Sequence, residues 1–301
     1  MSRTFQVIMV MLLILVGSVY LTPVFHSFLP MFKFEKIFNR LIMIFTIAAA
    51  AIFVLRQQRK NKKANAGRNF WREIGFDFSA PWFRLFLYGF LCGSFAVAFI
   101  VLSEVVCGPR YLRHPIEIQD IVERFFKGLL SGVIVGIIEE FFFRGFIFGY
   151  LKKRLPIFLA ILLASALYSM THFFDNGQVF IPQNPSIGDA FRLLVGYLEP
   201  FVNQWPEIFP QFMGLFIFGI ILCFSFLRSK SLFLSIGLHA GVVFAIKFQH
   251  SFAREPLEGV VYPFFGKSPD YDGSFEWATL ILLGLIVWFV ILPRFQFDRK
   301  H

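Results

Sequence analysis

Long apolar runs recur along the whole chain, and they constrain its fold more than any other feature. A helix needs about 20 mostly apolar residues to cross the ~30 Å hydrocarbon core of a bilayer. The segments that qualify are 5–25, 38–55, 82–106, 126–151, 156–174, 208–227, 231–250 and 276–293. These runs are continuous rather than alternating, which predicts helices and not barrel strands. We therefore predict an all-α fold, a polytopic membrane helix bundle of about eight transmembrane helices.

The composition agrees with burial in lipid. The chain is 57% hydrophobic, carries 16% charged residues and contains 45 Phe, whereas soluble domains carry about 25% charged residues. We predict a single membrane-embedded domain over residues 1–301. No convincing signal-peptidase site follows the first run, which favours an uncleaved first helix over a signal peptide. The three cysteines, Cys92, Cys107 and Cys223, suggest neither a disulfide framework nor a zinc-type cluster.

The basic residues predict the orientation of the chain. The net charge is +10, but the Lys and Arg residues form short clusters between apolar runs, so we expect no nucleic-acid partner. The clusters are Arg56 to Arg72, Lys152 to Arg154, Arg228 with Lys230, and Arg294 to Lys300. With eight spans, all of them fall on one side together with Arg3, and the positive-inside rule makes that side, with both termini, cytoplasmic. In a bacterial host, the membrane would be the plasma (inner) membrane. Within the 175–207 connection, the stretch 187–205 predicts an amphipathic helix at the outer interface.

The run 126–151 contains charged residues that a membrane span normally lacks. They are Glu139, Glu140 and Arg144, and each costs about 2.5–3.5 kcal/mol on insertion scales. Glu140 and Arg144 are four residues apart, so they share a helix face and can form an ion pair that fixes helix register. Glu139 points about 100° away and has no partner in its own helix. A structural ion pair therefore does not explain Glu139, which favours a functional role for it.

Two histidines in other apolar runs, His172 and His239, accompany these charges. A single His in an apolar helix is more often structural, but two in a bundle with Glu139 indicate a site. In one interpretation, Glu139, His172 and His239 hold Zn²⁺ or another divalent metal that activates water, and Glu140 shuttles protons. In the other there is no metal: Glu139 takes a proton from water with help from one His, and the other His polarises a carbonyl. Both interpretations make amide hydrolysis the natural reaction.

The order and spacing of these residues resemble a known family, the CAAX protease and bacteriocin-processing family (CPBP, Abi) of intramembrane endopeptidases. This family includes the Ras-converting prenyl-protein endopeptidase. The resemblance covers about residues 126–245. Its motif Glu-Glu-x-x-x-Arg is matched at Glu139, Glu140 and Arg144, with Phe143 before the Arg and Gly145 after it. Its motif Phe-x-x-x-His appears with Tyr168 and His172, and its third motif is matched at His239. The stretch from Phe218-Gly219 to Leu232 is similar to the usual lead-in.

The resemblance implies a catalytic cavity open toward the cytoplasm and the bilayer. It implies that Glu139 activates water with help from His172, that His239 lies near the oxyanion, and that Glu140 and Arg144 support the site. The family has been described both as metalloproteases and as metal-free glutamate proteases. The expected partners are the lipid bilayer and a membrane-associated or lipidated peptide or protein.

One residue departs from the prenyl-protein pattern. Val243 stands where those enzymes have Asn, a plausible oxyanion donor, and loss of one such donor typically lowers the rate by about 10²–10³. Cleavage of some other peptide is therefore expected ahead of true CAAX processing.

The leading hypothesis is an intramembrane endopeptidase that cuts a peptide bond near the cytoplasmic membrane face. An alternative is a non-catalytic membrane scaffold that binds a peptide, for bacteriocin immunity or regulation, and it would tolerate Glu139→Gln. A transporter with a Glu–His proton relay would need a continuous polar path. The first, second and eighth runs offer almost no polar residues for such a path.

Overall fold

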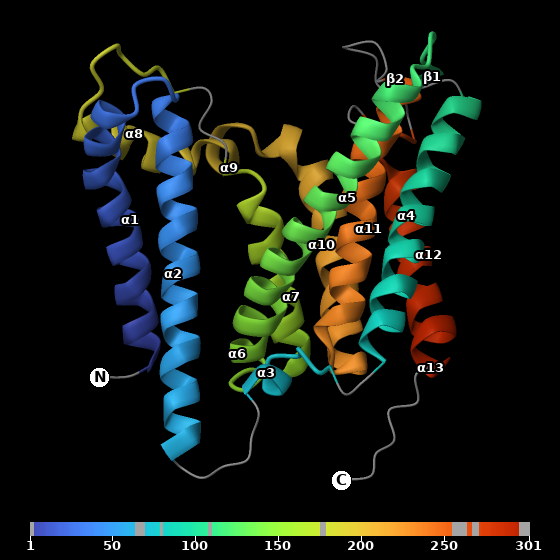
Figure 1. Ribbon diagram of the computed structural model, residues 1–301, viewed down its shortest axis with the longest axis horizontal. Coiled ribbons are helices and arrows are strands. Elements are labelled where there is room, and N and C mark those ends of the chain that lie inside the picture. Colours follow the sequence, from blue (N-terminus) through green and yellow to red (C-terminus); the bar gives the residue numbers. More distant parts are fainter. Residues whose placement is uncertain are drawn as a thin grey trace. The chain divides into compact units, whose positions relative to one another are not determined.

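The computed structural model describes residues 3–63, 70–78, 81–107, 110–174, 179–254, 264–266 and 271–294. These residues form helices joined by turns, together with the antiparallel pair β1 (Tyr111–Leu112) and β2 (Ala253–Arg254) (Figure 1). The chain divides into two compact units. The first unit is Met1–Phe70 with Thr171–Ile208, and the second unit is Trp71–Met170 with Phe209–His301. Each unit is described by itself below, and the single domain over 1–301 stays a prediction.

Each of the eight predicted runs forms helix. The helices are α1 (Arg3–Phe28), α2 (Phe34–Lys63), α4 (Trp82–Cys107), α5 (Ile118–Glu140) continuing through the π-helix η1 (Phe141–Phe148) into α6 (Gly149–Leu151), α7 (Ile157–Thr171), α10 (Trp205–Ser229), α11 (Leu232–Gln249), and α12 (Ser274–Ile286) continuing through the π-helix η2 (Val287–Ile291) into α13 (Leu292–Arg294). Shorter helices are α3 (Phe70–Glu73), α8 (Ile187–Gly196) and α9 (Glu199–Asn203).

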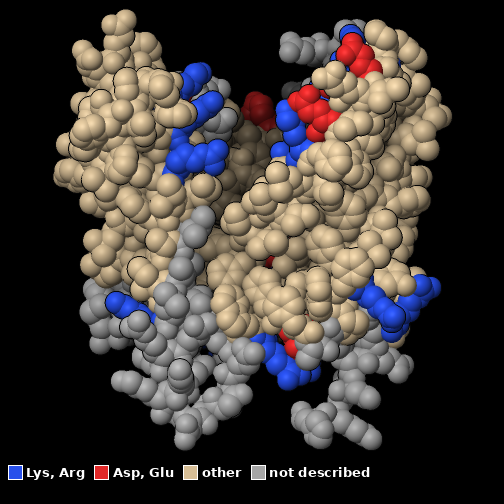
Figure 2. Space-filling view, in the orientation of Figure 1, with Lys and Arg blue, Asp and Glu red and all other residues tan. Residues whose placement is uncertain are grey.

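Among the described residues, five helical stretches are long and apolar enough to cross a membrane. They are Met9–Phe28, Trp82–Cys107, Trp205–Ser229, Leu232–Gln249 and Ser274–Arg294, while Ile157–Thr171 is apolar but shorter. Figure 2 agrees with this, because most of the face that it shows is neither acidic nor basic. The chain is therefore an integral membrane protein with an all-α polytopic fold, and the count of eight crossings stays a prediction.

The first unit packs α1, α2 and α8 around a small apolar cluster. Its buried members are Val19, Phe34, Phe38, Ala190 and Leu193. The stretch predicted to be an amphipathic helix forms α8 within 187–205. A capping box starts α8: Asp189 accepts hydrogen bonds from the backbone N–H and the hydroxyl of Ser186, which lowers the pKa of the Asp189 carboxyl and satisfies otherwise unpaired groups at the helix start.

In the second unit, α11 packs closely against α4 along a line of glycines. A Cβ atom at Gly237 of α11 would lie 2.1 Å from the carbonyl oxygen of Phe86 in α4, and one at Gly241 would lie 2.1 Å from that of Phe90. Gly89 and Gly93 of α4 meet α11 in the same way. Small residues four apart allow helix backbones to approach within a membrane, so no other residue fits these positions without moving α4.

The opposite side of α11 packs against α5 through a second line of glycines. Gly128, Gly132 and Gly136 of α5 face Phe244, Ala240 and Ile236 of α11, in that order. A Cβ atom at Gly132 would lie only 2.5 Å from the Ala240 carbonyl oxygen. The order of these contacts makes α5 and α11 antiparallel, as Figure 1 also shows. This register brings the residues after Gly136 next to the first turns of α11.

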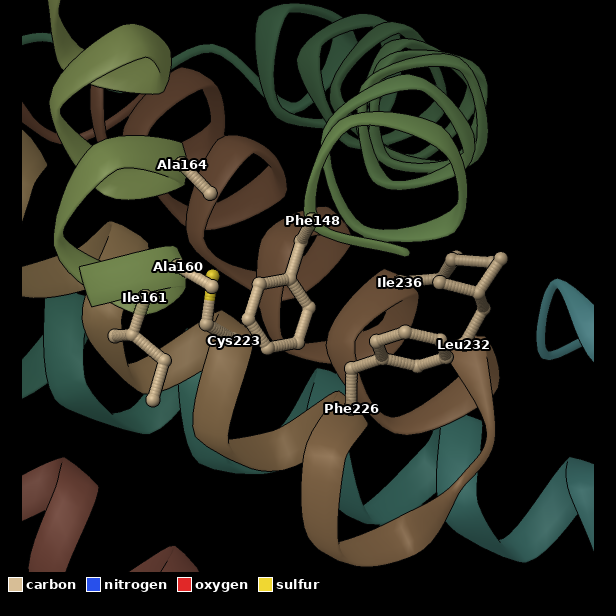
Figure 3. Close-up of a cluster of buried hydrophobic side chains, with 8 residues drawn as sticks. All are labelled: Phe148, Ala160, Ile161, Ala164, Cys223, Phe226, Leu232 and Ile236. Carbon is tan, nitrogen blue, oxygen red and sulfur yellow. The ribbon is translucent and has the colours of Figure 1, made fainter. Parts of the chain in front are cut away.

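An apolar cluster anchors the π-helix η1 to its neighbours (Figure 3). Phe148 of η1 lies among buried side chains of α7, α10 and α11, which are Ala160, Ile161, Ala164, Cys223, Phe226, Leu232 and Ile236. Phe148 and Phe226 meet edge to face with ring centroids 6.2 Å apart. The cluster therefore holds η1, which carries Arg144, against α7, α10 and α11.

A buried polar group joins the ends of α4 and α11. Arg110 Nε lies 2.7 Å from Glu104 Oε2, with both side chains fully buried, and Arg110 Nη1 donates to Gln249 Oε1 at 2.7 Å. Glu276, near the start of α12, is also fully buried. Breaking a buried ion pair by removal of one partner costs about 3–5 kcal/mol, so these residues fix how the helix ends are arranged.

Candidate active site

The glycine-lined face of α5 leads directly to Glu140. Gly128, Gly132, Gly136 and Glu140 follow at intervals of four residues, so they share the face that packs on α11, and the Glu140 side chain is fully buried. Glu139, one residue earlier, lies about 100° around α5 from Glu140, and its side chain is 28% exposed. The two adjacent carboxylates therefore occupy different environments.

Glu140 is held by Arg144, as the four-residue spacing predicts. Arg144 Nη1 donates to Glu140 Oε1 at 2.9 Å, with the Arg144 side chain 1% exposed. Arg144 Nη2 also donates to the carbonyl oxygen of Gly219 in α10 at 3.3 Å. Arg144 lies in η1, and such π-helical turns inside longer helices are frequent at functional sites. The guanidinium thus joins the start of η1 to α10.

His239 of α11 completes the buried charge network. Its Nδ1 lies 2.9 Å from Glu140 Oε1, and its Nε2 lies 3.8 Å from Glu139 Oε2. Because the carboxylate of Glu140 accepts hydrogen bonds, Nδ1 carries a proton, and Nε2 is the ring nitrogen that faces Glu139. The contact between α5 and α11 therefore brings three of the predicted site residues together.

Aromatic rings surround the imidazole of His239 and the guanidinium of Arg144. The guanidinium carbon of Arg144 lies 4.5 Å from the ring centroid of Tyr168 in α7. Tyr168 and Phe218 each meet the His239 ring edge to face, at 5.9 Å and 5.8 Å. Sequence reasoning did not include either ring in the site. The signals were present, because Tyr168 occupies the aromatic position of the second motif and Phe218 begins the lead-in stretch.

His172 does not lie within a helix, contrary to the predicted run 156–174. α7 ends at Thr171, and His172 follows in a turn at the start of the first unit's second segment. The apolar pattern continues into Phe173 and Phe174, but these side chains pack on Phe201, at 6.3 Å and 6.2 Å between ring centroids, instead of extending the helix. Hydropathy alone cannot separate these two outcomes. The role of His172 stays a prediction.

The predicted metal ligands are Glu139, His172 and His239. Among the residues that the structure describes, no group of three or more His, Cys, Asp or Glu side chains is arranged to hold a metal ion. Within the second unit, Glu139 Oε2 and His239 Nε2 are two atoms that could bind one ion. Two of the three predicted metal ligands therefore lie together in the second unit. Binding of one metal ion by all three residues stays a prediction.

Val243 lies one turn after His239 in α11 and is half-buried. The Val243 side chain has no hydrogen-bond donor. The side of α11 that carries His239 therefore lacks the donor that an Asn would supply at this position.

Comparison with known proteins agrees with the motif residues. Residues 121–245 match the family model described as type II CAAX prenyl endopeptidase Rce1-like. No curated protein and no solved structure matches the chain significantly. The matched residues run from α5 to α11 and include Glu139, Glu140, Arg144, His172 and His239. Residues 121–245 thus form an Rce1-like domain, similar to type II CAAX prenyl endopeptidases, and this similarity supports a peptide hydrolase that acts within the membrane.

Proposed function

We propose that the protein is an intramembrane endopeptidase in which Glu139 activates water and His239 stabilises the oxyanion, so that a peptide bond near the cytoplasmic membrane face is hydrolysed. One observation carries this proposal. Glu140 holds His239 by its Nδ1 atom at 2.9 Å, which directs Nε2 toward Glu139 Oε2 at 3.8 Å. A carboxylate and an oriented imidazole are the two groups that general acid–base hydrolysis of an amide requires.

The reaction follows from these positions. Glu139 takes a proton from water, and the resulting hydroxide attacks the carbonyl carbon of the scissile bond. Protonated His239, stabilised by Glu140, donates Nε2–H to the developing oxyanion. The proton on Glu139 passes to the leaving nitrogen as the C–N bond breaks. His172, as the resemblance implies, would assist Glu139, and with Val243 lacking a donor the oxyanion depends more heavily on His239.

Arg144 supports this arrangement without taking part in proton transfer. Its bonds to Glu140 Oε1 and to the Gly219 carbonyl oxygen hold the Glu140 side chain in place, so that Glu140 accepts the Nδ1–H of His239. The side chains of Arg144 and Glu140 are both almost fully buried, so the ion pair keeps one defined geometry. Removal of either partner leaves the other as an uncompensated buried charge.

A divalent metal ion is the alternative activator. Glu139 Oε2 and His239 Nε2 would be its ligands from the second unit, with His172 as the third. The bond from Nδ1 to Glu140 is the usual support for a metal-binding imidazole. A bound ion would supply Lewis acidity and a water molecule of lowered pKa.

The substrate that suits such a site is a membrane-associated or lipidated peptide, because most of the surface around it is apolar. Ile134, Ile137 and Ile138 of α5 are 47%, 42% and 41% exposed, so the sequence around Glu139 contacts a hydrophobic environment. We propose that both termini are cytoplasmic and, in a bacterial host, that the membrane is the inner one.

The test compares membrane-protein termini by mass spectrometry in cells that express the wild type or Glu139→Gln at equal levels. Glu123→Gln is the matched control, because Glu123 lies on the same helix in an exposed pair with Lys127. New termini with the wild type and the control, absent with Glu139→Gln, are expected and would name the substrate. Identical termini in all three strains would instead favour the non-catalytic peptide-binding scaffold.

A further inference from the structure

Two buried carboxyl groups meet between α4 and α12, which are neighbours in the second unit (Figure 1). Glu104 lies in the last turn of α4 and Glu276 in the first turn of α12, and neither residue is exposed. A side-chain hydrogen bond joins the two carboxyl groups. The neighbouring rings agree with this contact, since Phe99 of α4 and Phe275 of α12 stack with their centroids 5.8 Å apart. The start of α12 therefore packs on the end of α4.

The base that accompanies these carboxyl groups is Arg110. Its Nε atom lies 2.7 Å from Glu104 Oε2, with both side chains fully buried, and its Nη1 atom donates to the uncharged Gln249 of α11. Glu276 has no base of its own within the described part of the chain, and Asp272, in the turn before α12, adds another acid near it. If both glutamates were ionised, the buried group would therefore carry a net negative charge.

The start of α12 does not replace the missing base. Oε2 of Glu276 lies over the turn that begins the helix, because a Cβ atom at Gly273 would lie 2.1 Å from it. A helix N-terminus favours an anion at this position, but it is equivalent to only about half a positive charge. A second ionised carboxylate brings a full negative charge, and a buried ion without a full partner is costly.

The contact between the two carboxyl groups itself requires a proton. An ionised carboxylate can only accept hydrogen bonds, so two ionised carboxylates in contact repel each other. A carboxyl group that keeps its proton has one O–H donor, and it can donate to an ionised neighbour in a strong, charge-assisted bond. Because Glu104 is the carboxylate that faces Arg110, the proton belongs on Glu276.

We propose that Glu104 and Glu276 form a proton-binding site that holds one proton at neutral pH and so joins α4 to α12. The proton comes from the aqueous side at which α4 ends and α12 begins. Release of this proton leaves two like charges in contact, which pushes the first turn of α12 away from α4. The stability of the folded protein therefore decreases as the pH rises. This site is independent of the proposed peptidase function.

The first measurement counts the proton. The full-length protein is unfolded in detergent over a range of pH as the wild type, Glu276→Gln, Glu104→Gln and the control Glu123→Gln, which changes an exposed glutamate of α5. An unfolded Glu is ionised above about pH 5, whereas the folded pair keeps its proton. The unfolding equilibrium constant of the wild type should thus rise about tenfold more per pH unit than that of either buried variant. The control should follow the wild type.

The second measurement detects the proton in the folded protein. The C=O stretch of a protonated carboxyl group is separate from that of a carboxylate in infrared spectra. The wild type and the control should show this band at neutral pH, and both buried variants should lack its Glu276 component, because each leaves one carboxyl group for Arg110. If one buried variant does not fold, the other gives the same comparison. Equal pH dependence of unfolding in the wild type and the buried variants would overturn the proposal, and so would an unchanged carboxyl band.

Discussion

At the scale of single residues, the site depends on Glu140, which has two partners at once. It accepts from Arg144 and from His239 through the same oxygen, Oε1, at 2.9 Å in each case. Its neighbour Glu139 is partly exposed and faces the other nitrogen of the imidazole. We therefore propose separate tasks for the two adjacent glutamates, one orienting and one reactive.

The first prediction separates orientation from folding at Glu140. Glu140→Gln is expected to lower hydrolysis by about 10²–10⁴-fold, because a neutral amide no longer stabilises protonated His239. It should also lower the free energy of unfolding in detergent by about 3–5 kcal/mol, because the buried charge of Arg144 loses its partner. Adding Arg144→Met should restore much of the stability but none of the activity. Restored activity in the double variant would contradict the orienting role.

The second prediction concerns metal removal. In the proposed reaction Glu139 takes the proton from water and His239 donates to the oxyanion, so no step requires a metal ion. We therefore expect peptide hydrolysis by the purified protein to persist in excess EDTA, with total metal measured by mass spectrometry as the control. Loss of activity in EDTA that Zn²⁺ restores, and that His172→Ala makes permanent, would establish His172 as the third ligand.

At the scale of elements, the close contacts of α11 set the distances in the site. α11 lies against α4 on one side and α5 on the other, with glycines at both contacts. Because His239 lies between Gly237 and Gly241, any separation of these helices moves its imidazole away from Glu140.

The third prediction tests this dependence. Gly132→Leu places a side chain where even a Cβ would lie 2.5 Å from the Ala240 carbonyl oxygen. We expect a loss of about 3 kcal/mol or more in detergent unfolding and loss of hydrolysis. Gly149→Ala is the matched control, because its nearest neighbour, the Arg144 carbonyl oxygen, is 3.6 Å from the Cβ position. Equal stability of the two variants would show that the helices are not held by this contact.

At the scale of the whole molecule, the prediction of eight membrane crossings depends on the helix that carries the two glutamates. The continuous element α5–η1–α6 carries Glu139, Glu140 and Arg144, and its charged residues keep it outside the five stretches that satisfy the length and composition requirements. The same charges are those that a catalytic site in a membrane needs. The positive-inside rule nevertheless predicts a crossing, because the turn after α6 is rich in Lys and Arg.

The fourth prediction tests that crossing directly. Single cysteines at His114, before α5, and at Lys153, after α6, are introduced into a chain whose native cysteines are replaced by Ser. A membrane-impermeant maleimide is expected to label His114→Cys from outside intact cells and Lys153→Cys only in inverted vesicles. Labelling of both from the same side would mean that α5–η1–α6 does not span, and reversed labelling would overturn the cytoplasmic placement of the termini.

Much of the helical fold could be predicted from the sequence. Hydropathy located all eight helical runs to within a few residues at most ends. It can do so because the free-energy cost of burying polar backbone and side chains in lipid depends on each segment by itself. The Glu140–Arg144 pair was also predictable, since helix periodicity alone places residues four apart side by side. The end of α7 was not, because Phe173 and Phe174 are apolar whether they extend a helix or pack on Phe201.

The sequence by itself determined which segments are helical, which residues carry the family motif and which charges are anomalous in a membrane. Only the tertiary structure decided that Glu140, rather than Glu139, holds Nδ1 of His239, and that glycines set the spacing of α4, α5 and α11. The physical reason is that periodicity is a property of one helix. Register and distance between helices depend instead on how two surfaces fit, which no single segment encodes.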